Sequence, residues 1–68
     1  MTLSDLSPRR RQIVELISAG LSDKEIGVEL GIETQTVKNI LKNIYRQTAA
    51  HGRIALLNHF FSVVRKSP

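Results

Sequence analysis

Apolar residues recur at helical spacing in four separate stretches of the chain. Within each stretch they return every three or four positions, which is the period of an α-helix with one face turned to a core. Glycine and proline lie near the ends of these stretches, where they begin or end helices. The pattern predicts an all-α, compact four-helix domain, with helices at about residues 8–19, 23–30, 34–48 and 53–65.

The two central helices are bounded by capping signals. Ser22 and Glu25 have the spacing of a capping box, in which each side chain accepts a hydrogen bond from the backbone N–H of the other residue. Gly31 is a typical left-handed helix end, and Ile32 can pack back under the turn before the next helix begins at Thr34. Two short helices joined in this way are typical of a helix-turn-helix.

The third helix separates an apolar face from a polar face. Its apolar residues at helical spacing are Val37, Ile40, Leu41 and Ile44. The opposite face carries Gln35, Lys38, Asn39 and Lys42. A helix presented in this way fits the major groove of DNA, and these side chains have the length and the donors to reach base edges and phosphates. The alternative is an ordinary solvated helix surface, which from spacing alone is the commoner outcome.

Charge is distributed unevenly along the 68 residues, whose net charge is +4. All six carboxylates lie in residues 1–33, whereas the charged side chains of residues 34–68 are all cationic. The cations of that second half are Lys38, Lys42, Arg46, Arg53, Arg65 and Lys66. Such an uncompensated positive surface suggests a nucleic acid, because neutralising phosphates releases counterions and gives affinity. A solvated basic face is the alternative.

The first helix begins at a clear signal and carries an unusual run of arginines. Ser7 suits the N-cap and Pro8 the first helical position. Residues 1–6 are expected to be a frayed lead-in, with the alternative that Leu3 and Leu6 pack against the core. Arg9, Arg10 and Arg11 then fill the first turn, where cations sit badly at the positive end of the helix dipole. Contact of one or two of these arginines with phosphate would explain their presence, and Arg9 is the one that we expect to make it. A solvated face is the alternative.

The sequence predicts neither an enzyme nor a metal or cofactor site. His51 and His59 are separated by seven residues and have no cysteine or clustered carboxylate beside them. The glycines do not form a phosphate-binding loop, and Gly27 is expected to be a point of close packing between helices. With no signal peptide and no apolar run of bilayer length, we expect a cytoplasmic protein that does not enter a membrane. We also expect no small-molecule ligand within this chain.

Several short motifs resemble one family of transcription regulators. They are Leu6-Ser7, Gly20-Leu21-Ser22-Asp23-Lys24-Glu25-Ile26, Leu30-Gly31-Ile32 and Thr36-Val37-Lys38, with Arg53 at the spacing of the family. From Leu6 to about Phe61 the chain resembles the DNA-binding domain of LuxR-type regulators, which also ends many two-component response regulators. The resemblance implies a four-helix domain that binds double-stranded DNA, usually as a dimer through its last helix, and controls transcription in bacteria. RNA polymerase is a further candidate partner.

The resemblance also implies which residues contact DNA. The base-reading positions of the family fall on Lys38, Asn39 and Lys42. Its phosphate contacts fall near Ser22, Lys24, Thr34, Thr36 and Arg46. Together with Gln35 and Arg9, which the chain's own pattern suggests, these residues form the predicted contacts to the DNA backbone.

The chain departs from the family at several positions. Arg10 and Gln12 stand where the family usually has glutamates, so a bond from there to Arg53 can only be neutral. Glu33 replaces a serine or threonine before the third helix and is a poorer cap. Residues 48–50 read Thr-Ala-Ala where the family has Leu-Gly-Val, which leaves the packing of the last helix in question.

The last helix is apolar over about half of its circumference, which is wider than one core requires. We expect Leu56, Phe60 and Val63 to face the core. The remaining flank, predicted to form a homodimer interface, consists of Ile54, Leu57, Phe61 and Val64. In the alternative arrangement, these residues fold onto Leu3 and Leu6 in a monomer or once met another domain.

Two other functions share this pattern. Leu6-Ser7-Pro8-Arg9, Gly20-Leu21-Ser22 and Leu30-Gly31-Ile32 are also similar to the promoter-recognising C-terminal region of bacterial sigma factors, although the apolar tail after Arg53 argues against it. A different class is a protein-interaction module that keeps the fold but has lost DNA binding. Binding to duplex DNA separates that module from the other two.

Overall fold

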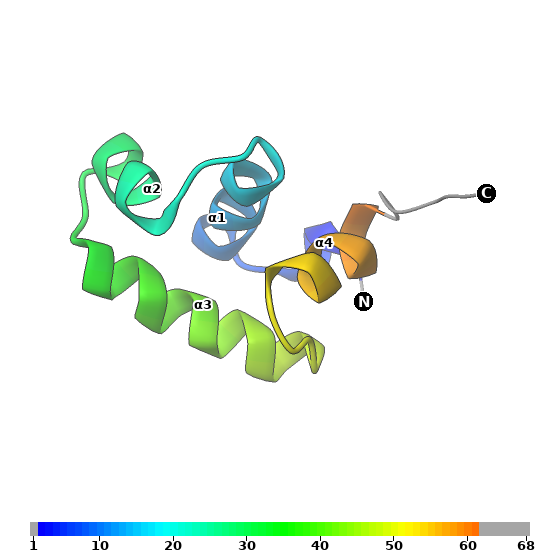
Figure 1. Ribbon diagram of the computed structural model, residues 1–68. Helices are drawn as coiled ribbons and strands as arrows, with labels where there is room; N and C mark the ends of the chain where they lie inside the picture. Colours follow the sequence, from blue (N-terminus) through cyan, green and yellow to red (C-terminus); the bar gives the residue numbers. More distant parts are fainter. Residues whose placement is uncertain (1, 62–68) are drawn as a thin grey trace.

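Four α-helices follow one another in the computed structural model, which describes residues 2–61 (Figure 1). They are α1 (Pro8–Ser18), α2 (Asp23–Leu30), α3 (Thr34–Thr48) and α4 (Arg53–Phe61), preceded by a short 3-10 helix, η1 (Leu3–Asp5). The predicted all-α class is confirmed, and the predicted helix boundaries agree within a residue up to the start of α4. The end of the fourth predicted helix, at residues 62–65, lies outside the described residues.

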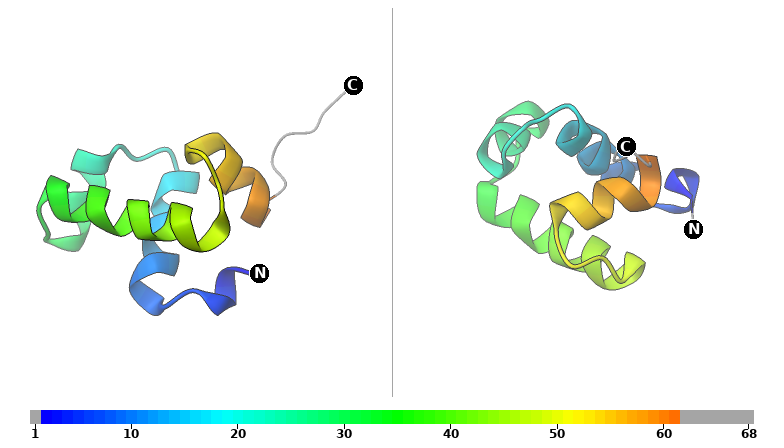
Figure 2. Two further views of the ribbon diagram at one scale, coloured as in Figure 1. Left: turned by 90° about the horizontal axis from the view of Figure 1, so that it is seen from below. Right: turned by 45° about the vertical axis from the view of Figure 1, so that its right-hand side comes forward.

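The longest helix, α3, organises the other three. In Figure 1 it runs along the lower side of the molecule, with α2, α1 and α4 above it. All three of those helices contact α3. Turning the molecule shows that, within residues 2–61, no other helix covers the far side of α3 (Figure 2). One long face of α3 is therefore available to a partner.

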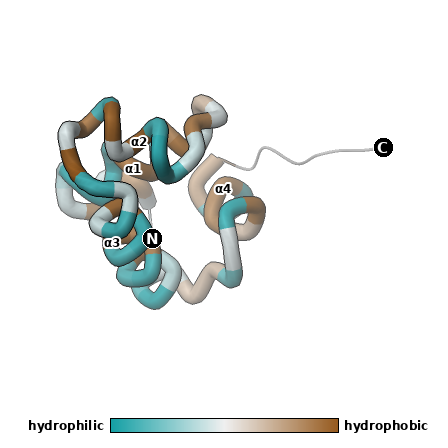
Figure 3. The backbone as a smooth tube through the Cα atoms, turned by 60° about the vertical axis from the view of Figure 1, so that its left-hand side comes forward, coloured by the Kyte–Doolittle hydropathy of each residue, from teal (hydrophilic) through white to brown (hydrophobic). Residues whose placement is uncertain are grey.

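The core takes residues from each helix and from the segment before α1. Its buried members are Leu6, Ile13, Val14, Ile17, Ile26, Val37, Leu41, Ile44 and Leu56. On the predicted apolar face of α3, Val37, Leu41 and Ile44 are buried, whereas Ile40 is only half-buried against this core. Colouring by hydropathy shows α3 with hydrophilic stretches alternating with apolar ones, as an amphipathic helix requires (Figure 3).

The segment before α1 packs against the core, so the structure supports the alternative offered by Leu3 and Leu6 over a frayed lead-in. The Thr2 backbone N–H donates to Asp5 Oδ2 at 2.8 Å, and this bond closes η1. The same backbone bond lowers the pKa of Asp5. Leu6 then reaches the core, and Leu3 packs against it. Burial of Leu6, with Leu3 half-buried beside it, holds this segment against the core.

The predicted capping signals are confirmed at the starts of α1 and α2. Ser7 Oγ accepts from the Arg10 N–H at 3.4 Å, with Pro8 in the first helical position. Ser22 Oγ accepts from the Glu25 N–H at 3.2 Å, and Glu25 Oε1 accepts from the Ser22 N–H at 2.8 Å. Each cap satisfies backbone donors that a helix start leaves unpaired, so both helices begin where the sequence indicates.

Gly27 is buried and is a point of close packing as predicted, since a Cβ there would meet both the turn after α2 and the backbone nitrogen of Thr34, the first residue of α3. A Cβ built at Gly27 would lie 2.7 Å from the backbone oxygen of Ile32. The Ile32 N–H also donates to the Gly27 carbonyl at 2.9 Å. The glycine therefore lets the chain after α2 fold back tightly onto α2, which brings α3 into position.

None of the helices within residues 2–61 is long and apolar enough to cross a membrane.

Candidate nucleic-acid interface

The outer face of α3 carries polar side chains that are free to meet a partner. Lys38, Asn39 and Lys42, the predicted base-reading residues, are all exposed. Gln35 and Arg46 are exposed as well. Since Val37, Leu41 and Ile44 are buried on the opposite side, the core fixes the direction in which this face points.

Two hydrogen bonds hold amide groups in place along this face. Gln35 Nε2 donates to Asn39 Oδ1 at 3.1 Å, across one turn of the helix. The Asn39 oxygen has a second lone pair, and its amide NH₂ can still donate, so the side chain remains able to read a base. Arg46 Nη1 donates to Asn43 Oδ1 at 3.4 Å, which leaves the other N–H groups of the guanidinium available.

The residues predicted to contact phosphates at the starts of α2 and α3 differ in exposure and in the hydrogen bonds that they already make. Lys24 and Thr36 are exposed, and Thr34 is half-buried as the first residue of α3. Ser22 is exposed, but its hydroxyl already accepts the capping bond from Glu25. Glu33 precedes α3 without a side-chain capping bond, as its poor capping ability predicted.

The arginines of the first turn of α1 lie next to the end of α3. Arg10 Nη1 donates to Gln47 Oε1 at 2.8 Å, which joins two positions far apart in the chain. Arg9 is exposed, whereas Arg10 and Arg11 are half-buried. Within residues 2–61, no carboxylate lies within ion-pairing distance of these arginines. Their charge therefore adds to that of Arg46, which is the neighbour of Gln47.

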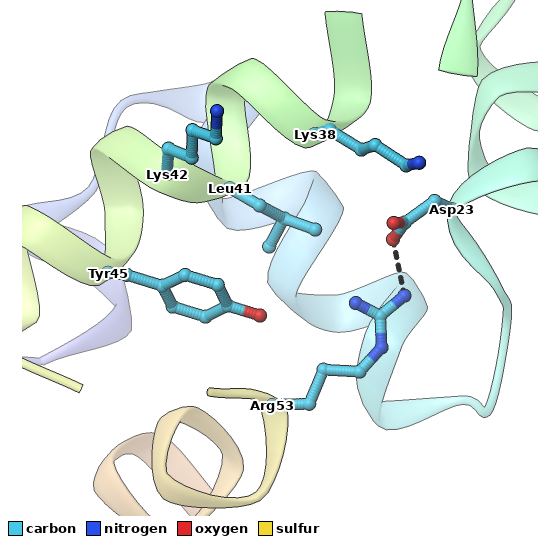
Figure 4. Close-up of a pocket in the computed structure, with 6 residues that line it drawn as sticks. All are labelled: Asp23, Lys38, Leu41, Lys42, Tyr45 and Arg53. Atoms are coloured by element: carbon cyan, nitrogen blue, oxygen red, sulfur yellow. Dashed lines mark hydrogen bonds and ion pairs between the residues drawn. The ribbon is translucent and has the colours of Figure 1, made fainter. Parts of the chain in front are cut away.

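A pocket of about 220 Å³ opens on the flank of α3 between the starts of α2 and α4 (Figure 4). Its lining consists of Asp23, Lys38, Leu41, Lys42, Tyr45 and Arg53. Arg53 Nη2 forms an ion pair with Asp23 Oδ1 at 2.5 Å. Burial lowers the pKa of Arg53, but the hydrogen bond and charge of Asp23, with a smaller effect of the neighbouring Tyr45, outweigh burial and raise the pKa overall. The guanidinium is thus held in its charged form at the pocket.

Sequence reasoning missed this pocket, although part of it was visible in the sequence. The spacing of Lys38, Lys42 and Tyr45 places the three side chains on one flank of α3. The pairing of Asp23 with Arg53, 30 residues apart, had no such local signal. Among the described residues, neither Arg10 nor Gln12 bonds to Arg53: Arg10 bonds to Gln47, and the partner of Arg53 comes from α2.

The predicted dimer flank of α4 is exposed only in part. Ile54 has 72% of its surface exposed. Leu57 and Phe61 are half-buried against the core, together with Phe60, and Leu56 is fully buried as expected. Val63 and Val64 lie outside the described residues. In the described part of α4, the apolar excess is therefore concentrated at Ile54.

Comparison with known proteins agrees with this geometry. The family described as bacterial regulatory proteins of the luxR family matches residues 4–60. YhjB of Escherichia coli (strain K12), a candidate HTH-type transcriptional regulator, is 45% identical over 51 residues, which cover 75% of this chain and 26% of YhjB. A nitrate/nitrite response regulator protein homolog of Haemophilus influenzae is 36% identical over 59 residues, which cover 87% of this chain and 28% of that protein.

The two-component response regulator PprB of Pseudomonas aeruginosa is 39% identical over 51 residues, which cover 75% of this chain and 18% of PprB. The chain thus spans less than a third of the length of each of these relatives. No solved structure matches it.

The fold and the exposed α3 define a helix-turn-helix domain of the kind that binds DNA. The chain belongs to the LuxR family of bacterial regulatory proteins. It is accordingly a DNA-binding domain for transcription regulation, in a family of regulators rather than enzymes.

Proposed function

We propose that the domain reads specific sites in double-stranded DNA by inserting α3 into the major groove. The observation that carries this proposal is that Lys38, Asn39 and Lys42 are all exposed on α3, outside the face that Val37, Leu41 and Ile44 bury. Lysine can donate to guanine O6 and N7, and asparagine can pair with adenine N6 and N7. A rigid helix that turns such donors away from its core is suited to direct base reading.

The remaining predicted contacts would bind the DNA phosphates on both sides of the major groove. Lys24, Thr34, Thr36 and Ser22 supply donors at the starts of α2 and α3. Arg46 and Arg9 lie near the other end of α3, because Arg10 joins the first turn of α1 to Gln47. Phosphate contacts of this kind set the register and the affinity but carry little sequence information.

The experiment compares Asn39→Ala with Arg46→Ala on duplexes that the protein itself selects from a random-sequence library. Asn39→Ala should cost about 1–3 kcal/mol at one base pair and little on unrelated DNA, whereas Arg46→Ala should weaken all sequences alike. For the wild type, log affinity should fall linearly with log salt, with a slope of about −0.9 per phosphate neutralised. Fluorescence anisotropy measures both quantities. Equal losses on selected and unrelated DNA for Asn39→Ala would contradict the proposed reading face.

The same proposal includes a homodimer formed through α4. The exposure of Ile54 supports it, since a large apolar side chain in solvent favours association. A symmetric pair would place two α3 helices on half-sites about 34–36 Å apart, one turn of DNA. Leu57, Phe61 and Val64 would complete the interface. RNA polymerase is proposed as a further partner, and DNA binding would place the protein in the bacterial cytoplasm.

Sedimentation equilibrium on Ile54→Glu tests the dimer with a matched control. Val28 on α2 has 78% of its surface exposed, so Val28→Glu adds the same charge at a similarly exposed site. We expect Ile54→Glu to weaken association strongly and Val28→Glu to leave it unchanged. A wild-type protein that stays monomeric at high micromolar concentration, or equal effects of the two variants, would contradict the α4 dimer.

A further inference from the structure

The pocket on the flank of α3 has the chemistry of an anion site. Lys38, Lys42 and Arg53 contribute cations, and Tyr45 contributes a hydroxyl that points toward the guanidinium (Figure 4). We propose that this pocket binds one phosphodiester group of the DNA backbone, with Arg53 and Tyr45 as contact residues. The inference rests on the proposed function and extends the DNA contacts to α4.

The charges around the pocket favour an anion even though Asp23 is present. Asp23 neutralises one of the three cations, so the lining keeps a net positive charge. Asp23 and Arg53 are also the first residues of α2 and α4. The positive ends of two helix dipoles therefore meet at this pocket and add to the field of the lysines.

Arg53 remains able to donate to a phosphate while it is paired with Asp23. The ion pair uses Nη2, and a guanidinium has further N–H groups in its planar fork. The Arg53 side chain is 35% exposed, so a ligand in the pocket can reach it. Asp23 thereby acts as a positioning residue, since it holds the guanidinium against α3 instead of letting it extend into solvent.

The lining favours a DNA strand over a free phosphate ion. Leu41 and the ring of Tyr45 offer apolar surface between the cations, which suits the deoxyribose carbons beside a backbone phosphate. Lys38 and Lys42 line the pocket and also belong to the base-reading face of α3. A strand whose bases meet that face would run past the pocket, so reading and holding would occur on adjacent nucleotides.

The test replaces single phosphates of the selected duplex, one at a time, by neutral methylphosphonates. In the wild type, one substitution at the pocket should weaken binding by about tenfold, the size expected for a charge-assisted bond. In Arg53→Gln that sensitivity should disappear at this phosphate alone, and Tyr45→Phe should reduce it. Arg46→Gln, with the same change of charge on the outer face of α3, should instead remove the sensitivity of a different phosphate. Circular dichroism melting confirms that each variant is folded.

The possible outcomes distinguish failure of the phosphate pocket from failure of DNA binding itself. Loss of one phosphate's sensitivity in Arg53→Gln supports the pocket. If Arg53→Gln keeps the wild-type sensitivity to methylphosphonate at every phosphate, the pocket does not hold DNA. The same conclusion follows if millimolar inorganic phosphate shifts the Tyr45 and Arg53 amide resonances while no methylphosphonate substitution depends on Arg53. If the wild type binds no duplex at all, the proposed function fails before the pocket is tested. An Arg53→Gln variant that does not fold is replaced by Asp23→Asn combined with Arg53→Gln, which leaves the net charge unchanged.

Discussion

The ends of α2 and α3 have nearly the same backbone conformation but carry different residues. Gly31 ends α2 with φ 69° and ψ 33°, and Ala49 ends α3 with φ 60° and ψ 22°. Both are left-handed, a conformation that glycine adopts freely and that costs other residues about 1–2 kcal/mol. The turn inside the helix-turn-helix is therefore relaxed, whereas the connection to α4 holds backbone strain.

The turn after α2 also has more backbone hydrogen bonds than the turn after α3. After α2, the N–H groups of Gly31 and Ile32 return to backbone carbonyls, with Ile32 bonded to Gly27 at 2.9 Å. After α3, the Ala50 N–H donates to the Thr48 hydroxyl at 3.4 Å, and that hydroxyl donates to the Ile44 carbonyl at 2.9 Å. A side chain thus substitutes for backbone bonds at the second turn. The helix-turn-helix is fixed by the backbone, whereas α4 depends on Thr48, the Asp23–Arg53 pair and Leu56.

The largest effect should come from removing the one fully buried side chain of the described part of α4. Leu56→Ala leaves a cavity in the core and should reduce the free energy of unfolding by about 2–5 kcal/mol. Ile54→Ala, two residues away but exposed, should change it by less than about 0.5 kcal/mol when the protein is dilute enough to be monomeric. Urea unfolding followed by circular dichroism measures both. A small loss for Leu56→Ala would show that α4 is not part of the cooperative unit.

A smaller loss is expected from placing a side chain at the relaxed turn. Gly31→Ala meets no neighbouring atom, so its cost is conformational. The left-handed penalty of about 1–2 kcal/mol is partly offset by the lower entropy of the unfolded chain, about 0.4–1 kcal/mol, which leaves a net loss of about 1 kcal/mol. Urea midpoints at constant m-value report the difference. An unchanged midpoint would mean that the turn tolerates a Cβ without strain.

The reverse substitution at the strained turn should stabilise the protein. Ala49→Gly removes the left-handed penalty but adds freedom to the unfolded chain, so we expect a net gain of about 0.5–1 kcal/mol. Ala50→Gly, one residue later, has no positive φ to relieve and serves as the control that should destabilise. If both glycines destabilise, Ala49 is not strained, and the difference between the two helix ends carries no energetic meaning.

The same contrast explains how far the sequence could predict the molecule. The capping box of Ser22 and Glu25, Gly31 and the apolar period of α3 are local signals, so the helix-turn-helix and its outward residues followed from the sequence. The order of residues 2–6, the left-handed Ala49 and the Asp23–Arg53 pair depend on burial or on partners far along the chain. A periodicity of apolar residues contains no information on such pairings. The apolar breadth of α4 was visible, but how it divides between the core and the surface was decided by the packing of Leu57 and Phe61.

The smallest effect concerns pH and the cap of α2. The backbone hydrogen bond from Ser22, helped by the Ser22 side chain, lowers the pKa of Glu25. A carboxylate whose pKa is lower in the folded state stabilises the protein above its unfolded pKa, and that stability is lost as the pH falls through the folded value. Glu25→Gln should therefore flatten the fall in urea midpoint below the pH at which an unperturbed glutamate titrates. Glu29→Gln removes one charge from the same helix without touching the cap, so it should keep the wild-type slope. Identical slopes for Glu25→Gln and wild type would show that the capping bond adds no pH-dependent stability.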